Sequence, residues 1–159
     1  MGRDRRLAKL PQSLAACVPL PASRPIAKAD YVALAEFRNA LREFLAFSET
    51  AARAAGLTSQ QHQALLAIKG FAGGDDLTVS EMADRLLLRH HSAVELADRL
   101  GRLGLVRRRA DLKDQRRVLI SLTAKAERIL NGLSATHLEE IRRVGPYLAA
   151  LFDRFGKGG

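Results

Sequence analysis

The residues whose types and spacing could perform chemistry gather in one stretch, 85–117, where basic side chains dominate. This stretch holds ten Lys and Arg against four Asp and Glu, whereas residues 29–84 hold four against eight. Basic side chains neutralise phosphates and release condensed counterions, so such a cluster favours a polyanion as partner. A charge run taken alone is more often a solvated face. The secondary structure predicted for this stretch therefore has to distinguish a polyanion-binding surface from a solvated charged face.

The remaining chemistry-bearing residues form no recognisable catalytic or metal-binding motif. His90 and His91 are adjacent and point to different sides of a helix, unlike an i, i+4 ligand pair, and His62 and His137 lie far from them in the sequence. The sequence contains no phosphate-cradling glycine motif and no nucleophile elbow. We therefore expect no enzyme, no metal and no cofactor. His90 and His91 are interpreted either as DNA contacts or as ordinary residues of a helix start.

Two short helices are predicted to carry the first part of the basic stretch. Thr78 and Glu81 have the spacing of a capping box, in which each side chain satisfies a backbone N–H at the helix start. A second helix follows the break near Leu88 and ends at Gly104, which can adopt the left-handed conformation that stops a helix. Apolar residues at helical spacing define its buried side: Ala93, Leu96, Ala97, Leu100 and Leu103.

A β-hairpin is predicted after the second helix. Val118, Ile120 and Leu122 recur with period two, as in a half-buried strand, and residues 105–109 offer the partner strand. The connecting residues 110–116 are charged and contain no tight-turn dipeptide. Two helices followed by a hairpin with a basic tip describe a winged helix-turn-helix. In that geometry the second helix can enter the DNA major groove while the hairpin reaches the adjacent minor groove.

At these residues the sequence resembles the MarR family of bacterial transcriptional regulators. The resemblance starts at Leu57 and Thr58 and continues through LTVSEMADRL and ADRLGRLGLV. It then includes the loop motif DLKDQR and ends at Leu122 and Thr123. The resemblance covers about two thirds of the chain, and it implies a fold that is mostly α with a small β-hairpin.

The loop between the two strands departs from the family pattern at one position. The family pattern Asp-x-Arg-Asp-x-Arg is met by Asp111, Lys113, Asp114 and Arg116. Lys113 stands where the family usually has Arg, and a lysine is a more hydrated point charge than the planar guanidinium. The resemblance implies that Lys113 occupies the tip of the wing. Asp111 and Asp114 are expected to shape the loop, with Asp114 holding Arg116 in an ion pair.

The resemblance and the helix pattern together imply a set of DNA contacts. Glu95 departs from the family, which often has a basic or small polar residue at this position. A carboxylate repels phosphates but can accept a hydrogen bond from cytosine N4, so Glu95 either reads sequence or points away from DNA. The side chains expected to face the major groove are His91, Ser92, Glu95 and Arg99. Phosphate contacts are expected from Arg107, Arg108, Arg109 and Arg117, and further DNA contacts from His90, Lys113 and Arg116.

The two ends of the chain are expected to mediate dimerisation. Amphipathic helices are predicted in residues 29–56 and 124–156, with a break at Gly145-Pro146, on either side of a winged helix-turn-helix at 57–123. Their apolar faces exceed the needs of one small core. In the MarR family the chain ends interlock into a homodimer, which implies reading helices roughly 34 Å apart on a pseudopalindromic site. The alternative is that these helices only fold back on their own domain.

Residues 1–28 are predicted to form a basic, irregular tail, because they hold four of the five prolines. Cys17 is the single cysteine, which excludes a disulfide within the chain. Some MarR relatives sense oxidants through an N-terminal thiol, but no activating neighbour of Cys17 is apparent. No export signal or membrane span is recognised, so we expect a cytoplasmic protein.

The expected function is that of a homodimeric regulator that binds double-stranded DNA. The resemblance implies a repressor that is released by a small aromatic or anionic effector, although no residue pattern identifies the effector site. A winged-helix protein–protein adaptor is the main alternative, since this fold is sometimes used without DNA. An adaptor should lack a basic reading face, which this chain has. A redox sensor acting through Cys17 is a further alternative.

Overall fold

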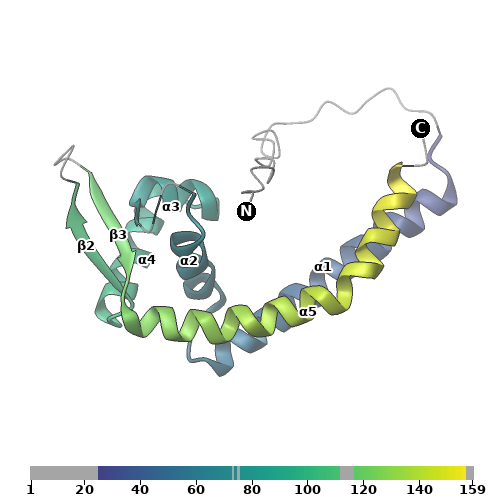
Figure 1. The fold of residues 1–159 in the computed structure, drawn as a ribbon. Helices are drawn as coiled ribbons and strands as arrows, with labels where there is room; N and C mark the ends of the chain where they lie inside the picture. The colour runs from purple at the N-terminus through teal and green to yellow at the C-terminus, as the bar shows by residue number, and fades with distance from the viewer. Residues whose placement is uncertain (1–24, 73, 75, 112–116, 157–159) are drawn as a thin grey trace, which may run out of the picture.

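The computed structural model describes residues 25–72, 74, 76–111 and 117–156, so the predictions for Cys17 and for most of the N-terminal tail lie outside it. A winged domain lies at one end of an arm that α1 and α5 form by packing against each other (Figure 1). The predicted fold class, mostly α with a small β element, is confirmed. The elements in chain order are α1 (Lys28–Ala54), α2 (Ser59–Lys69), β1 (Asp76–Thr78), α3 (Val79–Leu86), α4 (His90–Arg102), β2 (Val106–Ala110), β3 (Val118–Leu122) and α5 (Ala124–Gly156).

The last helix is continuous, and the predicted break at Gly145-Pro146 is wrong. α5 runs from Ala124 to Gly156 with Pro146 inside it. A proline ring normally disfavours the helical conformation of the preceding residue by clashing with its Cβ, and Gly145 has no Cβ. The costs that remain are one missing N–H donor and the clash of the ring with the carbonyl four residues earlier, which a helix can accommodate by bending. Figure 1 shows α5 bending toward its C-terminal end, alongside α1.

The sheet has three antiparallel strands in the order β1-β3-β2. The predicted hairpin is present, with Val106 paired to Leu122 and Ala110 paired to Val118. A third strand, β1, was not predicted from the sequence; it begins at Asp76. β1 has only three residues and one fully buried side chain, Leu77, so its sequence is too short to show the alternation of apolar and polar residues that indicates a strand. Only pairing with β3 makes it a strand.

One core fills the winged domain and continues into the start of α5. The second helix of the pair buries its predicted side, with the exception of Leu103, which is 46% exposed. That expectation is wrong because Leu103 is the C-cap residue, beyond the last turn of α4. Its carbonyl instead accepts a hydrogen bond from Lys125 Nζ at 3.0 Å. The largest fully buried side chains of the core are Leu65, Ile68, Leu77, Met82, Leu96, Leu100, Leu105 and Ile120.

Two helices are followed by a glycine with positive φ, and Gly104 is the one predicted from the sequence. Gly104 adopts φ +67 after α4, and Leu105 is buried directly behind it. Gly56 adopts φ +77 after α1, where an L side chain would be strained. In the described part of the chain, no helix is both long and apolar enough to cross a lipid bilayer.

Candidate DNA-binding surface

The start of α3 is fixed by the predicted capping box. The Thr78 N–H donates to Glu81 Oε2 at 2.7 Å, and the Glu81 N–H donates to Thr78 Oγ1 at 3.2 Å. The Thr78 hydroxyl also donates to Glu81 Oε2 at 2.8 Å. The hydrogen bond from the Thr78 backbone is the main reason that the pKa of Glu81 lies below its usual value, although burial opposes the shift. These contacts hold the carboxylate charged at neutral pH and the helix start in place.

The turn between α3 and α4 contains a left-handed leucine. Leu87 has φ 53 and ψ 40, and its side chain is 88% exposed. The Leu88 N–H donates to the Ala83 carbonyl at 2.9 Å, which closes the end of α3. α4 begins at His90 without a side-chain cap. The turn thus sets the angle between the two helices at the cost of an unfavourable backbone conformation.

α4 has one buried side and one open side. His91, Glu95 and Arg99 lie on the open side and are exposed, and we call these three residues the reading face. Ser92 is half-buried. Within the described residues, Glu95 and Arg99 form no ion pair, so their charges are available to a partner. The buried side consists of Ala93, Leu96, Ala97 and Leu100.

The wing is formed by β2 and β3. The Asp111 N–H donates to the Arg117 carbonyl at 2.9 Å, which extends the ladder one step past the strands. The tip of the wing lies outside the described residues, and with it lie Lys113, Asp114 and Arg116. The DNA contacts predicted for Lys113 and Arg116, and the shaping role predicted for Asp114, therefore stay predictions.

Arginine side chains of β2 are paired with acidic residues of neighbouring elements. Arg108 Nη1 lies 2.6 Å from Asp98 Oδ1 of α4, and Arg108 Nη2 donates to the Val94 carbonyl at 3.3 Å. Arg109 pairs with Asp76 of β1. Arg107 is exposed and forms no ion pair within the described part of the chain. The three arginines of β2 are thus not equivalent, because two of them already pair with carboxylates.

Arg117 lies between two carboxylates at the start of β3. Its guanidinium is 3.7 Å from Glu81 Oε1 and 3.8 Å from Asp111 Oδ2. Asp111 thus contacts a residue at the base of the loop, and its predicted shaping role stays a prediction. All these arginine pairs are partly exposed, so each contributes little stability and a phosphate can replace the carboxylate.

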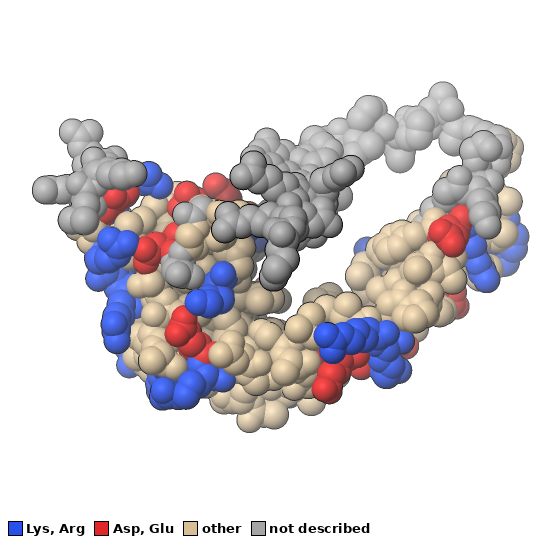
Figure 2. Space-filling view, in the orientation of Figure 1, with Lys and Arg blue, Asp and Glu red and all other residues tan. Residues whose placement is uncertain are grey.

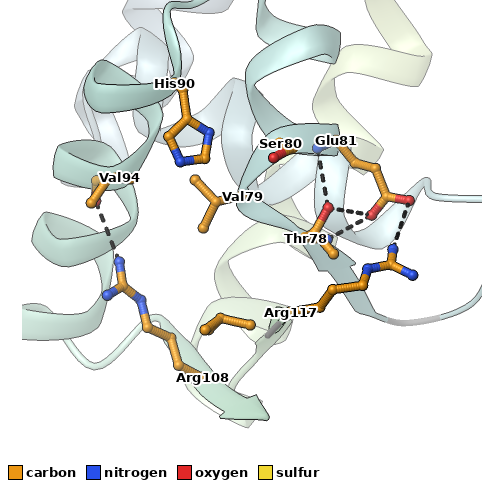
Figure 3. Close-up of a pocket in the computed structure, with 9 residues that line it drawn as sticks. Thr78, Val79, Ser80, Glu81, His90, Val94, Arg108 and Arg117 are labelled. Atoms are coloured by element: carbon orange, nitrogen blue, oxygen red, sulfur yellow. Dashed lines mark hydrogen bonds and ion pairs between the residues drawn. The ribbon is translucent and has the colours of Figure 1, made fainter. Parts of the chain in front are cut away.

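A cleft of about 510 Å³ lies between α3, α4 and the wing (Figure 3). Arg108 and Arg117 reach into it from the two strands, and His90 enters from the start of α4. Figure 3 shows Arg108 held by Val94 and Arg117 held by Glu81 on opposite sides of the cleft. The residues that line it are Thr78, Val79, Ser80, Glu81, His90, Val94, Arg108, Arg117 and Val118. Its hydroxyl, imidazole and guanidinium groups suit the phosphates of a nucleic acid backbone.

Charge on the winged domain is mixed. Figure 2 shows basic side chains over the outer side of this domain, where β2, β3 and α4 lie, with acidic side chains between them. Asp98, Asp76 and Glu81 belong to the acidic set. Sequence reasoning did not single out Asp98 or Asp76, because their partners lie on other elements and no local spacing signals the contact.

The four histidines separate into two groups. His90 and His91 are exposed at the start of α4, as expected for residues that can meet DNA. His62 and His137 are buried and lie against each other, with ring centroids 4.7 Å apart. The described residues contain no cluster of three or more His, Cys, Asp or Glu that could hold a metal ion.

Known proteins share this architecture. The crystal structure of AbsC, a MarR family transcriptional regulator from Streptomyces coelicolor, matches with a TM-score of 0.64 and 20% identity over 76% of this chain and 81% of that one. The crystal structure of RV1404 from Mycobacterium tuberculosis matches with a TM-score of 0.65 and 18% identity, over 87% of this chain and 99% of that one. The crystal structure of the S. aureus MepR–DNA complex matches with a TM-score of 0.56 and 22% identity, over 76% of this chain and 95% of that one. No curated protein matches the sequence.

These likenesses define the class of protein as a winged helix-turn-helix with long terminal helices. The family model that matches is that of the MarR family (MarR_2), over residues 55–117. That range contains α2, β1, the helix pair and β2, and it ends immediately before β3. Residues 55–117 are therefore a winged domain of the MarR type, and the fold is that of AbsC, a MarR family transcriptional regulator.

Proposed function

We propose that this protein is a cytoplasmic, homodimeric transcriptional regulator that reads a pseudopalindromic operator through α4 and acts as a repressor. The observation that carries the proposal is the reading face, where His91, Glu95 and Arg99 are exposed on a helix whose other side is buried in the core. A helix held this way can enter the major groove, where base edges present distinct hydrogen-bond patterns. The cleft beside α4 would then lie against the sugar–phosphate backbone.

Apolar side chains on the arm support the dimer. Large apolar residues of α1 and α5 remain 40–56% exposed although the two helices already pack together. A second copy that covered them would form an apolar interface of the kind found in obligate dimers. These residues are Tyr31, Val32, Leu34, Leu41, Leu45, Leu138, Ile141, Tyr147 and Phe152.

A two-fold axis between the arms would bring two copies of α4 to one side of DNA. Reading helices about one turn of B-DNA apart, roughly 34 Å, then call for an inverted repeat. MepR of S. aureus, which has been solved in complex with DNA, shares the fold that this geometry needs. Release of DNA by a small aromatic or anionic effector is proposed from the family resemblance, and no residues are assigned to its binding.

The proposal is tested by selection from random-sequence duplex DNA with the purified full chain at near-physiological salt. We expect an inverted repeat with half-sites about one helical turn apart to be enriched. Enrichment of a single, unrepeated half-site would contradict the dimer. Retention without any enriched sequence would contradict sequence-specific reading, and no retention would favour the protein–protein adaptor.

A further inference from the structure

A buried pair of histidines joins the winged domain to the arm. His62 of α2 is 3% exposed and His137 of α5 is 9% exposed. Their ring centroids are 4.7 Å apart with the planes inclined by 46°. The DNA-binding surface described above uses neither residue. The contact lies where the first helix of the winged domain meets the two long helices.

The hydrogen bonds of His137 define its protonation pattern. Its Nδ1 lies 2.7 Å from the Leu133 carbonyl, which only accepts, so Nδ1 carries a proton. Its Nε2 lies 2.8 Å from Ser48 Oγ of α1. In the neutral ring Nε2 accepts from the Ser48 hydroxyl, and in the charged ring Nε2 donates to the same oxygen. His137 therefore keeps both hydrogen bonds in either state.

His62, in contrast, lacks a hydrogen-bond partner at one ring nitrogen within the described part of the chain. Its Nδ1 is buried and has no hydrogen-bond partner among the described residues. A neutral imidazole tolerates an unprotonated Nδ1 there, whereas a charged imidazole would bury an N–H that no acceptor meets. Burial is the main reason that the pKa of His62 lies below its usual value, and the charge of His137 adds to the shift.

Among the described residues, no carboxylate acts on the charge of His62. α1 contributes the Ser48 hydroxyl and the rings of Phe44 and Phe47, which contact His137 edge-on. α5 contributes His137 itself and the Leu133 carbonyl. Among the described residues, His137 is the titratable group that acts on His62. A second proton on the pair is therefore opposed by like charge and by the missing acceptor together.

We propose that the His62–His137 pair is a pH-sensitive contact that loosens the seating of α2 on α1 and α5 when both rings become protonated. α2 packs against both long helices and against α3, the first helix of the helix pair. Displacement of α2 would therefore change how α3 and α4 are held relative to the arm. Acidification weakens DNA binding by this route, in addition to any titration at the DNA surface itself.

The direction of the pH effect follows from linkage. The folded state prefers neutral His62, so the unfolded chain binds more protons than the folded chain near pH 6. The stability gained from the neutral pair is complete above the unfolded-state value of about 6.5 and is lost as the pH falls through the folded-state pKa.

The test measures the melting temperature of the full chain between pH 5 and 8, for wild type and for His62→Leu. We expect the melting temperature of the wild type to fall by a few degrees more than that of the variant between pH 7.5 and 5.5. His62→Gln is the second variant, because it keeps a polar side chain that does not titrate. His90 and His91 are present in all three proteins, so their titration cancels in the comparison.

DNA binding distinguishes a switch from a contact that only stabilises the fold. The ratio of Kd at pH 6.0 to Kd at pH 7.5 is measured on one duplex for the three proteins, and we expect the wild-type ratio to be several-fold larger than either variant ratio. Parallel melting curves would overturn the proposal, as would equal Kd ratios despite different melting curves. If the wild type binds no DNA at any pH, the function proposed above has failed, and the melting curves alone decide this inference.

Discussion

The guanidinium of Arg108 in β2 lies 2.6 Å from the carboxylate of Asp98 in α4, so a side chain of the wing holds the helix that carries the reading face. Arg108 also donates to the Val94 carbonyl of α4. Asp98 is therefore a positioning residue, which sets where Arg108 lies without a need to touch DNA itself. The pair also cancels one positive charge on the surface that must meet phosphates.

Substitution Asp98→Asn should free Arg108 for phosphate. We expect tighter binding to non-specific DNA, with the slope of log K against log salt steeper by about one, because one more cation becomes available to the duplex. Stability should change by less than about 1 kcal/mol, since both partners are partly exposed. Titrations at several salt concentrations check this result. Glu139→Gln, an exposed acid on α5, is the control for the change in net charge. An unchanged slope for Asp98→Asn would show that Arg108 does not reach phosphate.

The capping box at the start of α3 should make stability depend on pH in the acid range. Glu81→Gln should cost about 1 kcal/mol at pH 7, because the N-cap contacts and the contact with Arg117 weaken. The folded-state pKa of Glu81 is lowered, so its contribution is present above the unfolded-state value and is lost as the pH falls through the folded-state pKa.

Thermal melting of the Glu81→Gln variant at pH 7 and near pH 3 checks this prediction. We expect the difference from wild type to shrink at the lower pH. Gln61 occupies the same position in the capping box of α2 and does not titrate, so Gln61→Ala is the control. A Glu81→Gln deficit that stays constant with pH would rule out the charged carboxylate as its source.

Leu87 should be a site where glycine stabilises the protein. Its left-handed conformation costs a non-glycine residue about 1–2 kcal/mol, and its exposed side chain supplies little packing in return. The extra entropy of glycine in the unfolded chain offsets part of the gain, so Leu87→Gly should raise the melting temperature by roughly 2 °C. Leu88→Gly, next in the chain and packed against the core, should lower it. A lower melting temperature for Leu87→Gly would mean that the Leu87 side chain has a partner.

The apolar face of the arm should be the dimer interface. Ile141→Glu places a charge among exposed apolar residues of α5, and we expect the sedimenting mass to fall to that of one chain at micromolar concentration. Leu66→Glu is the matched control, since Leu66 is similarly exposed on α2 but lies outside the arm. If both variants sediment like the wild type, the arm does not form the interface.

Local signals in the sequence predicted most of the fold. The capping box at Thr78 and the glycine stop at Gly104 involve residues within a few positions of one another, and both are present. The misplaced break at Pro146 came from a rule for average helices, which the adjacent glycine relaxes. β1 was missed because only its partner strand makes it a strand.

The site was less predictable than the fold. The exposed side of α4 follows from helical periodicity, so His91, Glu95 and Arg99 were identified in advance. The partners of the arginines were not, because Asp98 and Arg108 are ten positions apart on different elements. The contact between His62 and His137 was not predicted for the same reason, because the two residues lie far apart in the sequence on different helices.

Base readout by α4 is tested by the bases that variants of the protein prefer. Selection from random-sequence DNA is repeated with Glu95→Ala, and with Arg107→Ala as the variant of a phosphate contact. We expect Glu95→Ala to change the preferred base at one position, the same in both half-sites. Arg107→Ala should keep the wild-type motif and bind it more weakly, with a shallower salt dependence. Recovery of the unaltered wild-type motif with Glu95→Ala would contradict base reading by Glu95.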